Sequence, residues 1–165
     1  MAAGALYKIL SPLKERKTLR FCLVGAILPD ADVLAFTFGI PYESMLGHRG
    51  FTHSILFALL YAVFCLLFYR QSLNKLRYFL LFFLSIMSHG IFDMLTNGGH
   101  GVGLLIPFNS TRYFFPYTPI EVSPIGRYFF SYRGLEVLIN EAFWIGIPCL
   151  TLIVIHKFFN RKQTL

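Results

Sequence analysis

Apolar residues along the chain gather into four long segments separated by more polar stretches. A helix needs about 20 apolar residues to cross a bilayer core, with a range of about 17–25. Three segments meet this requirement and are predicted to span a membrane, whereas the first is too short to cross alone. The segments are Leu19–Leu28, His53–Tyr69, Tyr78–Leu95 and Val137–Phe159.

The two remaining parts of the chain complete the predicted architecture. Ala2–Leu10 could extend the first segment around a break at Pro12, so this segment is a half-span or a broken helix. Residues 97–136 contain Gly98-Gly99, several prolines and many aromatic side chains. Such irregular backbone cannot face lipid, because its amides would be unpaired, and aromatic rings prefer the membrane interface. We therefore expect an interfacial loop that could act as a lid.

Together these elements predict an all-α, polytopic helical membrane protein, with residues 1–165 forming a single membrane-embedded domain. The composition agrees, since 56% of the residues are apolar and only 14% are charged. Soluble domains carry about a quarter charged residues. These values exclude a disordered chain, and three cysteines without a CxxC pair exclude a disulfide scaffold.

The formal net charge of +7 would suggest nucleic-acid binding in a soluble protein. Here the basic residues form clusters at 8–20, 70–77 and 157–162, each beside an apolar segment. Membrane proteins place such clusters on the cytoplasmic side. We therefore predict membrane lipids as partners and no nucleic acid, although four arginines on the opposite side weaken this charge bias.

Acidic residues and histidines gather at the ends of the segments that lie away from the basic clusters. His89 and Asp93 are four residues apart and therefore share one face of a helix. Imidazole and carboxylate groups suit Zn2+ and also Mn2+, so the chain is predicted to bind one or two divalent ions. The predicted ligands are Asp30, Asp32, His48, His53, His89 and Asp93.

Simpler interpretations remain open for each of these residues. Asp30 and Asp32 could be turn residues, and His89 with Asp93 could be a buried hydrogen-bonded pair. A proton or ion pathway would also place ionisable groups inside membrane segments.

Further residues could contribute to catalysis. Arg49 and Arg112 are predicted to clamp an anion, because a guanidinium pairs with phosphate oxygens in a fork geometry. Either could instead form a structural ion pair with Asp30, Asp32 or Glu43. Asp30 or Asp32 could accept a proton from the attacking water. Glu141, at the head of the last segment, could be an extra ligand or base, or an interfacial carboxylate.

Three motifs in fixed order resemble the membrane-bound metal-dependent hydrolase family of bacterial inner membranes. They are LPDAD at 28–32, GHRGFTHS at 47–54 and SHGIFD at 88–93. More distantly, the pattern is similar to zinc-dependent phospholipase C. The resemblance implies a metal-dependent hydrolase that uses the six predicted ligands. Family members often carry a histidine near the N-terminus, which this chain lacks, so the number of metal ions stays open.

These observations predict an integral-membrane hydrolase of the bacterial inner membrane with its site on the periplasmic side. Metal-activated water would attack a phosphoester at the membrane surface. The depth of the site suggests an amphiphilic substrate such as a lipid or polyprenyl phosphate. The alternatives are an ion or proton transporter, and a non-enzymatic scaffold with a structural metal site.

Overall fold

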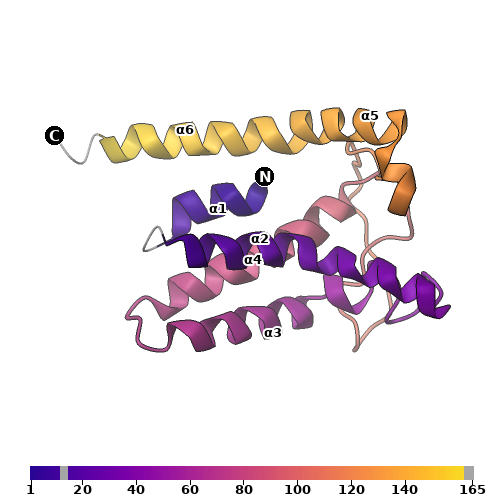
Figure 1. Cartoon of the computed structure of the whole chain (residues 1–165), viewed down its shortest axis with the longest axis horizontal. Coiled ribbons are helices and arrows are strands. Elements are labelled where there is room, and N and C mark those ends of the chain that lie inside the picture. The colour runs from indigo at the N-terminus through magenta and orange to yellow at the C-terminus, as the bar shows by residue number, and fades with distance from the viewer. Residues whose placement is uncertain (12–14, 162–165) are drawn as a thin grey trace.

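The computed structural model describes residues 1–11 and 15–161, and the regular structure in these ranges is helical (Figure 1). The predicted all-α fold is therefore confirmed. Elements labelled η are 3-10 helices, except η5, which is a π-helix. The elements are α1 (Ala2–Leu10), α2 (Arg16–Ile27), η1 (Leu28–Phe38), η2 (Phe51–His53), α3 (Ile55–Leu66), η3 (Leu67–Tyr69), α4 (Lys75–Met94), η4 (Gly126–Phe130), α5 (Tyr132–Glu141), η5 (Ala142–Gly146) and α6 (Ile147–Arg161).

Three helices of the described chain are long and apolar enough to cross a membrane, which confirms the polytopic architecture. They are accompanied by one shorter apolar helix, Ile55–Tyr69. The candidate spans are Arg16–Phe38, Lys75–Met94 and Tyr132–Phe159.

The first apolar segment is longer than predicted, and the expectation of a half-span was wrong. α2 continues directly into η1, so the combined helix Arg16–Phe38 has 23 residues. Pro29 lies in the first turn of η1, where its missing N–H does not break the helix. Gly39 ends η1 in the left-handed conformation. The predicted break at Pro12 lies outside the described residues.

The second apolar segment is shorter than predicted. Its helix begins after Ser54, whose side chain accepts a hydrogen bond from the Phe57 N–H at 3.1 Å. The helical stretch Ile55–Tyr69 falls short of the length of a full span. His53 consequently lies in the preceding turn, η2, rather than inside a membrane helix.

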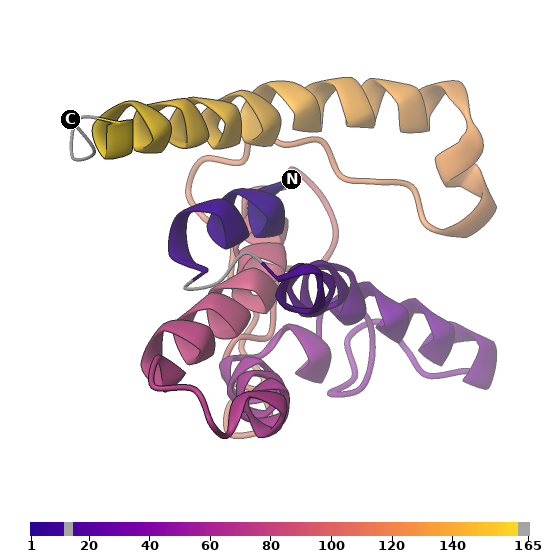
Figure 2. The same cartoon turned by 60° about the vertical axis from the view of Figure 1, so that its left-hand side comes forward.

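Helix α4 lies at the centre of the bundle, where it packs against α1, α2 and α3 (Figures 1 and 2). Its residues Tyr78, Leu81 and Phe82 are almost fully buried. The ring of Tyr78 packs on Tyr69 with centroids 4.3 Å apart. This packing fixes α4, and it therefore also fixes the position of the polar residues at the C-terminal end of that helix.

The C-terminal part of the chain forms one continuous helix from α5 through η5 to α6, which lies along one side of the bundle (Figure 2). This helix contacts α1. The stretch before it is irregular, as predicted, with isolated bridges that pair Thr96 with Ile120 and Val102 with Tyr113. The predicted loop 97–136 ends earlier, because η4 begins at Gly126 and α5 at Tyr132.

Candidate metal centre

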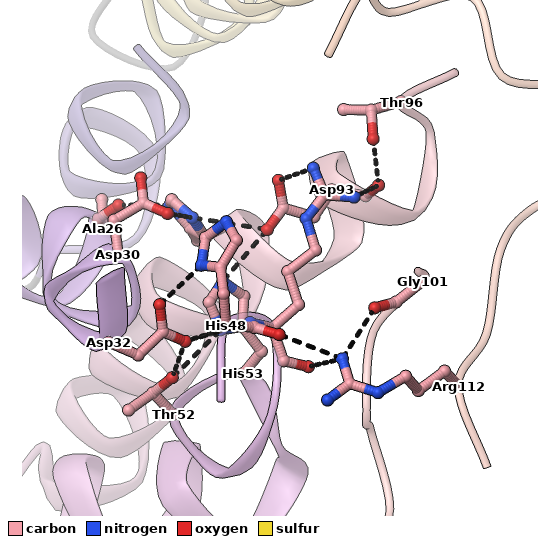
Figure 3. A network of polar contacts seen from close by, with 12 residues as sticks. Ala26, Asp30, Asp32, His48, Thr52, His53, Asp93, Thr96, Gly101 and Arg112 are labelled. Carbon is pink, nitrogen blue, oxygen red and sulfur yellow. Dashed lines mark hydrogen bonds and ion pairs between the residues drawn. The ribbon is translucent and has the colours of Figure 1, made fainter. Parts of the chain in front are cut away.

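Four of the six predicted ligands converge at one point of the described chain (Figure 3). Asp30 comes from η1, His53 from η2, and His89 and Asp93 from α4. Each offers one ligand atom, and the four atoms all lie within 4.8 Å of one another. Nε2 of His53 lies 3.0 Å from Oδ2 of Asp93, and Nε2 of His89 lies 3.2 Å from Oδ1 of Asp30.

Three of these ligand atoms are buried and form no hydrogen bond among the described residues, and their close neighbours are the other members of the cluster: Nε2 of His53, Nε2 of His89 and Oδ2 of Asp93. A buried polar atom without a partner costs free energy, so native structures rarely leave several together. A divalent cation between these atoms would satisfy all three at once. The donor set therefore fits a metal ion.

Both histidines are oriented so that Nε2 faces the cluster. Nδ1 of His89 lies 2.8 Å from the carbonyl oxygen of Ala26, to which it donates. Nδ1 of His53 lies 3.2 Å from Oδ2 of Asp32 and 3.1 Å from the Thr52 hydroxyl. A metal-binding imidazole characteristically donates its other N–H in this way, which leaves the unprotonated nitrogen for the ion.

Asp32 lies beside the cluster rather than in it. Its Oδ1 accepts a hydrogen bond from Nδ1 of His48 at 2.6 Å. Its Oδ2 accepts from the Thr52 hydroxyl at 2.6 Å and from the Arg49 backbone N–H at 3.1 Å. Because both oxygens are engaged, Asp32 positions the 48–53 turn, and the structure gives no support for its predicted role as a ligand.

His48 is likewise outside the four-residue cluster. Its bond to Asp32 leaves Nε2 as the free ring nitrogen, and the ring lines the cavity in front of the cluster. The structure therefore brings His48 close to the candidate metal centre without making it a member.

Burial lowers the pKa of His53, but the neighbouring carboxylates of Asp32 and Asp93 raise it more. The net result is a pKa above the ordinary value of 6.5. Two carboxylates around one imidazole stabilise its protonated form, and a divalent cation would compete with that proton.

Arg49 is buried next to the cluster. Its Nη2 donates to Oδ1 of Asp93 at 3.2 Å, and its Nη1 donates to the Gly98 carbonyl at 2.9 Å. Arg49 therefore forms a structural ion pair, but its partner is Asp93 and not one of the acidic residues expected from the sequence. Within the described residues, Nε of Arg49 is buried and has no hydrogen-bond partner, and the residue lines the cavity.

The guanidinium of Arg112 is not available as the anion clamp that the sequence predicts, because backbone carbonyls occupy it. Both terminal nitrogens donate to backbone carbonyls, and Figure 3 shows the bonds of Nη1. These contacts connect the 42–49 loop with Gly101 and with the segment that carries Arg112, so Arg112 is structural in this arrangement. The accepting carbonyls belong to Tyr42, Ser44, His48, Arg49 and Gly101.

A cavity of about 730 Å3 opens in front of the cluster. Asp30, His89 and Asp93 line one part of it, and Glu141 lines it from the C-terminal helix. This volume lies in the range of about 300–1,000 Å3 typical of small-molecule sites. The cavity therefore brings Glu141 into the same space as three of the candidate ligands.

Sequence reasoning missed the roles of Thr52 and of the Ala26 carbonyl. Thr52 lies in the same motif, GHRGFTHS, as His48 and His53. Its position within this motif is the sequence feature that could have indicated its role. The Ala26 carbonyl carries no signal in the sequence, because every residue has one.

Comparison with known proteins identifies relatives of the whole chain. A family model described as "YdjM inner membrane protein" matches residues 1–163. Inner membrane protein YbcI of Escherichia coli (strain K12) is 40% identical over 134 residues, which cover 79% of this chain and 77% of the relative. No solved structure matches the chain. These descriptions give a location and no reaction, so they lend no support to the hydrolase or phospholipase C resemblance.

Proposed function

The chain belongs to the YdjM inner membrane protein family, and from this premise we propose that it is an integral-membrane, metal-dependent hydrolase of a phosphoester. Its substrate is an amphiphile at the membrane surface, such as a lipid or polyprenyl phosphate. The observation that carries the proposal is the convergence of ligand atoms from Asp30, His53, His89 and Asp93, of which the last three are buried and form no hydrogen bond among the described residues.

One divalent ion fits the cluster better than two. Asp30, His53, His89 and Asp93 supply two imidazole nitrogens and two carboxylates, a set typical of Zn2+ that also admits Mn2+. The second predicted ion would need Asp32 and His48, whose side chains are bonded to each other. When bound, a divalent ion lowers the pKa of water and neutralises charge on a phosphoryl oxygen.

The chain's own residues supply the remaining functions. Asp30 is the better proton acceptor of the two predicted carboxylates, because its side chain is 53% exposed whereas that of Asp32 is 3% exposed. The guanidinium of Arg49, which lines the cavity, would contribute positive charge next to the substrate phosphate. Asp32 keeps the histidine-bearing turn in place through His48 and Thr52.

The site faces the periplasm in this proposal. The basic residues around Arg16 and Lys75 lie at the opposite ends of α2 and α4 from the cluster. Since basic ends of membrane helices are retained in the cytoplasm, the end that carries Asp30 and Asp93 is the periplasmic one.

Metal analysis of the purified protein tests the metal centre. The wild type should bind about one zinc ion per chain, and the His53→Ala and Asp93→Ala variants should bind none. His100→Ala is the matched control, because His100 is exposed and pairs with Glu43 away from the cluster. Full zinc content in both cluster variants would contradict the proposal.

Phosphoester hydrolysis tests the reaction. The zinc-loaded wild type in detergent should release the headgroup or phosphate from an amphiphilic phosphoester, and Asp30→Asn should not. Zinc binding without turnover, together with unfolding when zinc is chelated, would favour a scaffold. Metal flux across proteoliposomes without hydrolysis would favour a transporter.

A further inference from the structure

We propose that the cavity admits its ligand sideways from the bilayer, as an amphiphile whose anionic head reaches the Asp30–His53–His89–Asp93 cluster while its alkyl chain lies between η1 and η4. This inference rests on the proposed function and deepens it, because it specifies where the hydrocarbon chain of the substrate lies and by which route the substrate arrives.

The lining of the cavity is chemically mixed. Arg49, His89 and Asp93 line it, and so do apolar side chains, among them Val33 of η1 and Phe129 of η4. A ligand that contacts both kinds of side chain must carry a charged group and an apolar group, because burying either against the wrong lining is unfavourable.

The polar side chains of the lining suit one anionic head. The carboxylates of Asp30 and Asp93 balance a divalent ion, and the guanidinium of Arg49, which lines the cavity, contributes a further positive charge. A phosphate head close to this guanidinium would be attracted by the opposite charge.

Residues of two candidate membrane-spanning helices line the cavity. Asp30 belongs to the candidate span Arg16–Phe38 and Glu141 to the candidate span Tyr132–Phe159, each roughly two turns from the nearer end. Both residues line the cavity.

Exposed apolar side chains lie beside Asp30 on the first of these helices and on η4. Ile27 and Leu34 flank Asp30, and both are more than half exposed, as is Phe130 on η4. We expect these side chains to contact lipid in the membrane, so a ligand that enters between η1 and η4 would come from the acyl chains. A water-soluble phosphoester has no reason to prefer such an entrance, whereas a lipid is already there.

Photolabelling tests the route without requiring turnover. The probe is an octylphosphonate with a diazirine near the end of its chain, added to the zinc-loaded protein in detergent, and adducts are located by mass spectrometry. We expect labels within residues 125–130 and around Val33 that require zinc and are removed by excess octylphosphonate, but not by the same concentration of methylphosphonate.

Different failures of this experiment have different meanings. Equal competition by methylphosphonate would overturn the lipid route while leaving a phosphoester hydrolase intact. Labelling that is unchanged when zinc is removed would also overturn the route. A protein that binds no zinc would overturn both the route and the proposed function.

A pair of variants provides a second measurement. Val33→Asn combined with Phe129→Asn should weaken zinc-dependent octylphosphonate binding at least tenfold, since each buried methylene contributes about fourfold. Zinc affinity and methylphosphonate binding should not change. The matched control is Val154→Asn with Phe159→Asn, two exposed positions on α6 outside the cavity lining. Equal octylphosphonate affinity in both double variants would overturn the proposal.

Discussion

Nδ1 of His48 and Oδ1 of Asp32 lie 2.6 Å apart, while the other oxygen of the same carboxylate lies 3.2 Å from Nδ1 of His53. One buried carboxylate therefore orients two imidazole rings, each through the same ring nitrogen. His53 consequently presents Nε2 to Asp93, and His48 presents its ring to the cavity. Asp32 is therefore a positioning residue that acts on the candidate metal centre through His53.

Replacing Asp32 with Asn should weaken zinc binding without abolishing it. Loss of a carboxylate that orients a metal-binding histidine typically costs about 10–100-fold in metal affinity. The measurement is a competition titration against a chromophoric chelator, with Glu43→Gln as the control, because Glu43 is exposed and outside the cluster. Complete loss of zinc from Asp32→Asn would mean that Asp32 is itself a ligand.

Zinc affinity should depend on pH through His53. Its pKa in the metal-free protein lies above 6.5, because the carboxylates of Asp32 and Asp93 outweigh the effect of burial. The proton must leave before zinc binds, so affinity should fall as the pH decreases through this raised pKa and level off above it. Titrations at several pH values measure the effect, and an affinity that is constant across this range would contradict the assignment.

Arg112→Ala should destabilise the protein by about 2–4 kcal/mol, because it removes charge-assisted hydrogen bonds to several buried carbonyls. Thermal unfolding in detergent measures the loss. Arg127→Ala is the matched control, since Arg127 is exposed and contacts the ring of Tyr128. A variant as stable as the wild type that no longer binds methylphosphonate would instead support the anion clamp predicted from sequence.

Gly99→Ala should disturb the position of Arg49. Gly99 has a φ of +84°, and a Cβ atom there would lie 2.8 Å from Oη of Tyr42 and 3.0 Å from Nη1 of Arg49. We expect a loss of about 1–3 kcal/mol in stability from backbone strain, together with weaker phosphonate binding. Gly4→Ala, which meets nothing within 4 Å, should be neutral or slightly stabilising in thermal unfolding.

Local spacing explains why part of the candidate site could be predicted from the sequence. His89 and Asp93 are four residues apart on one helix, so their common face follows from helix geometry alone. Asp30 follows the first apolar segment and His53 opens the second. Both positions lie on the same side of the membrane as His89 and Asp93, so the four side chains are expected to lie close together. The convergence of these four residues was inferred from segment ends, and the structure brings them together.

Other features depend on contacts that spacing does not reveal. A carboxylate that binds a metal and one that orients a histidine look alike in sequence, which is why Asp32 and His48 were grouped with the ligands. Pro29 is compatible with both a turn and the first turn of a helix, and only the packing of η1 against the rest of the fold decides between them. Arg112 contacts carbonyls more than 60 residues earlier, and carbonyls have no sequence signature.

The position of Arg112 also affects the order in which parts of the protein can fold during synthesis. It bonds to the carbonyl of Tyr42 across 70 residues of chain, and both α3 and α4 lie between them. During synthesis the loop that carries His48 and Arg49 therefore emerges long before the side chain that secures it. A chain truncated after α4 would contain all four candidate ligands and yet lack the tie that holds one of their supporting loops, so it should bind zinc less tightly than the full chain.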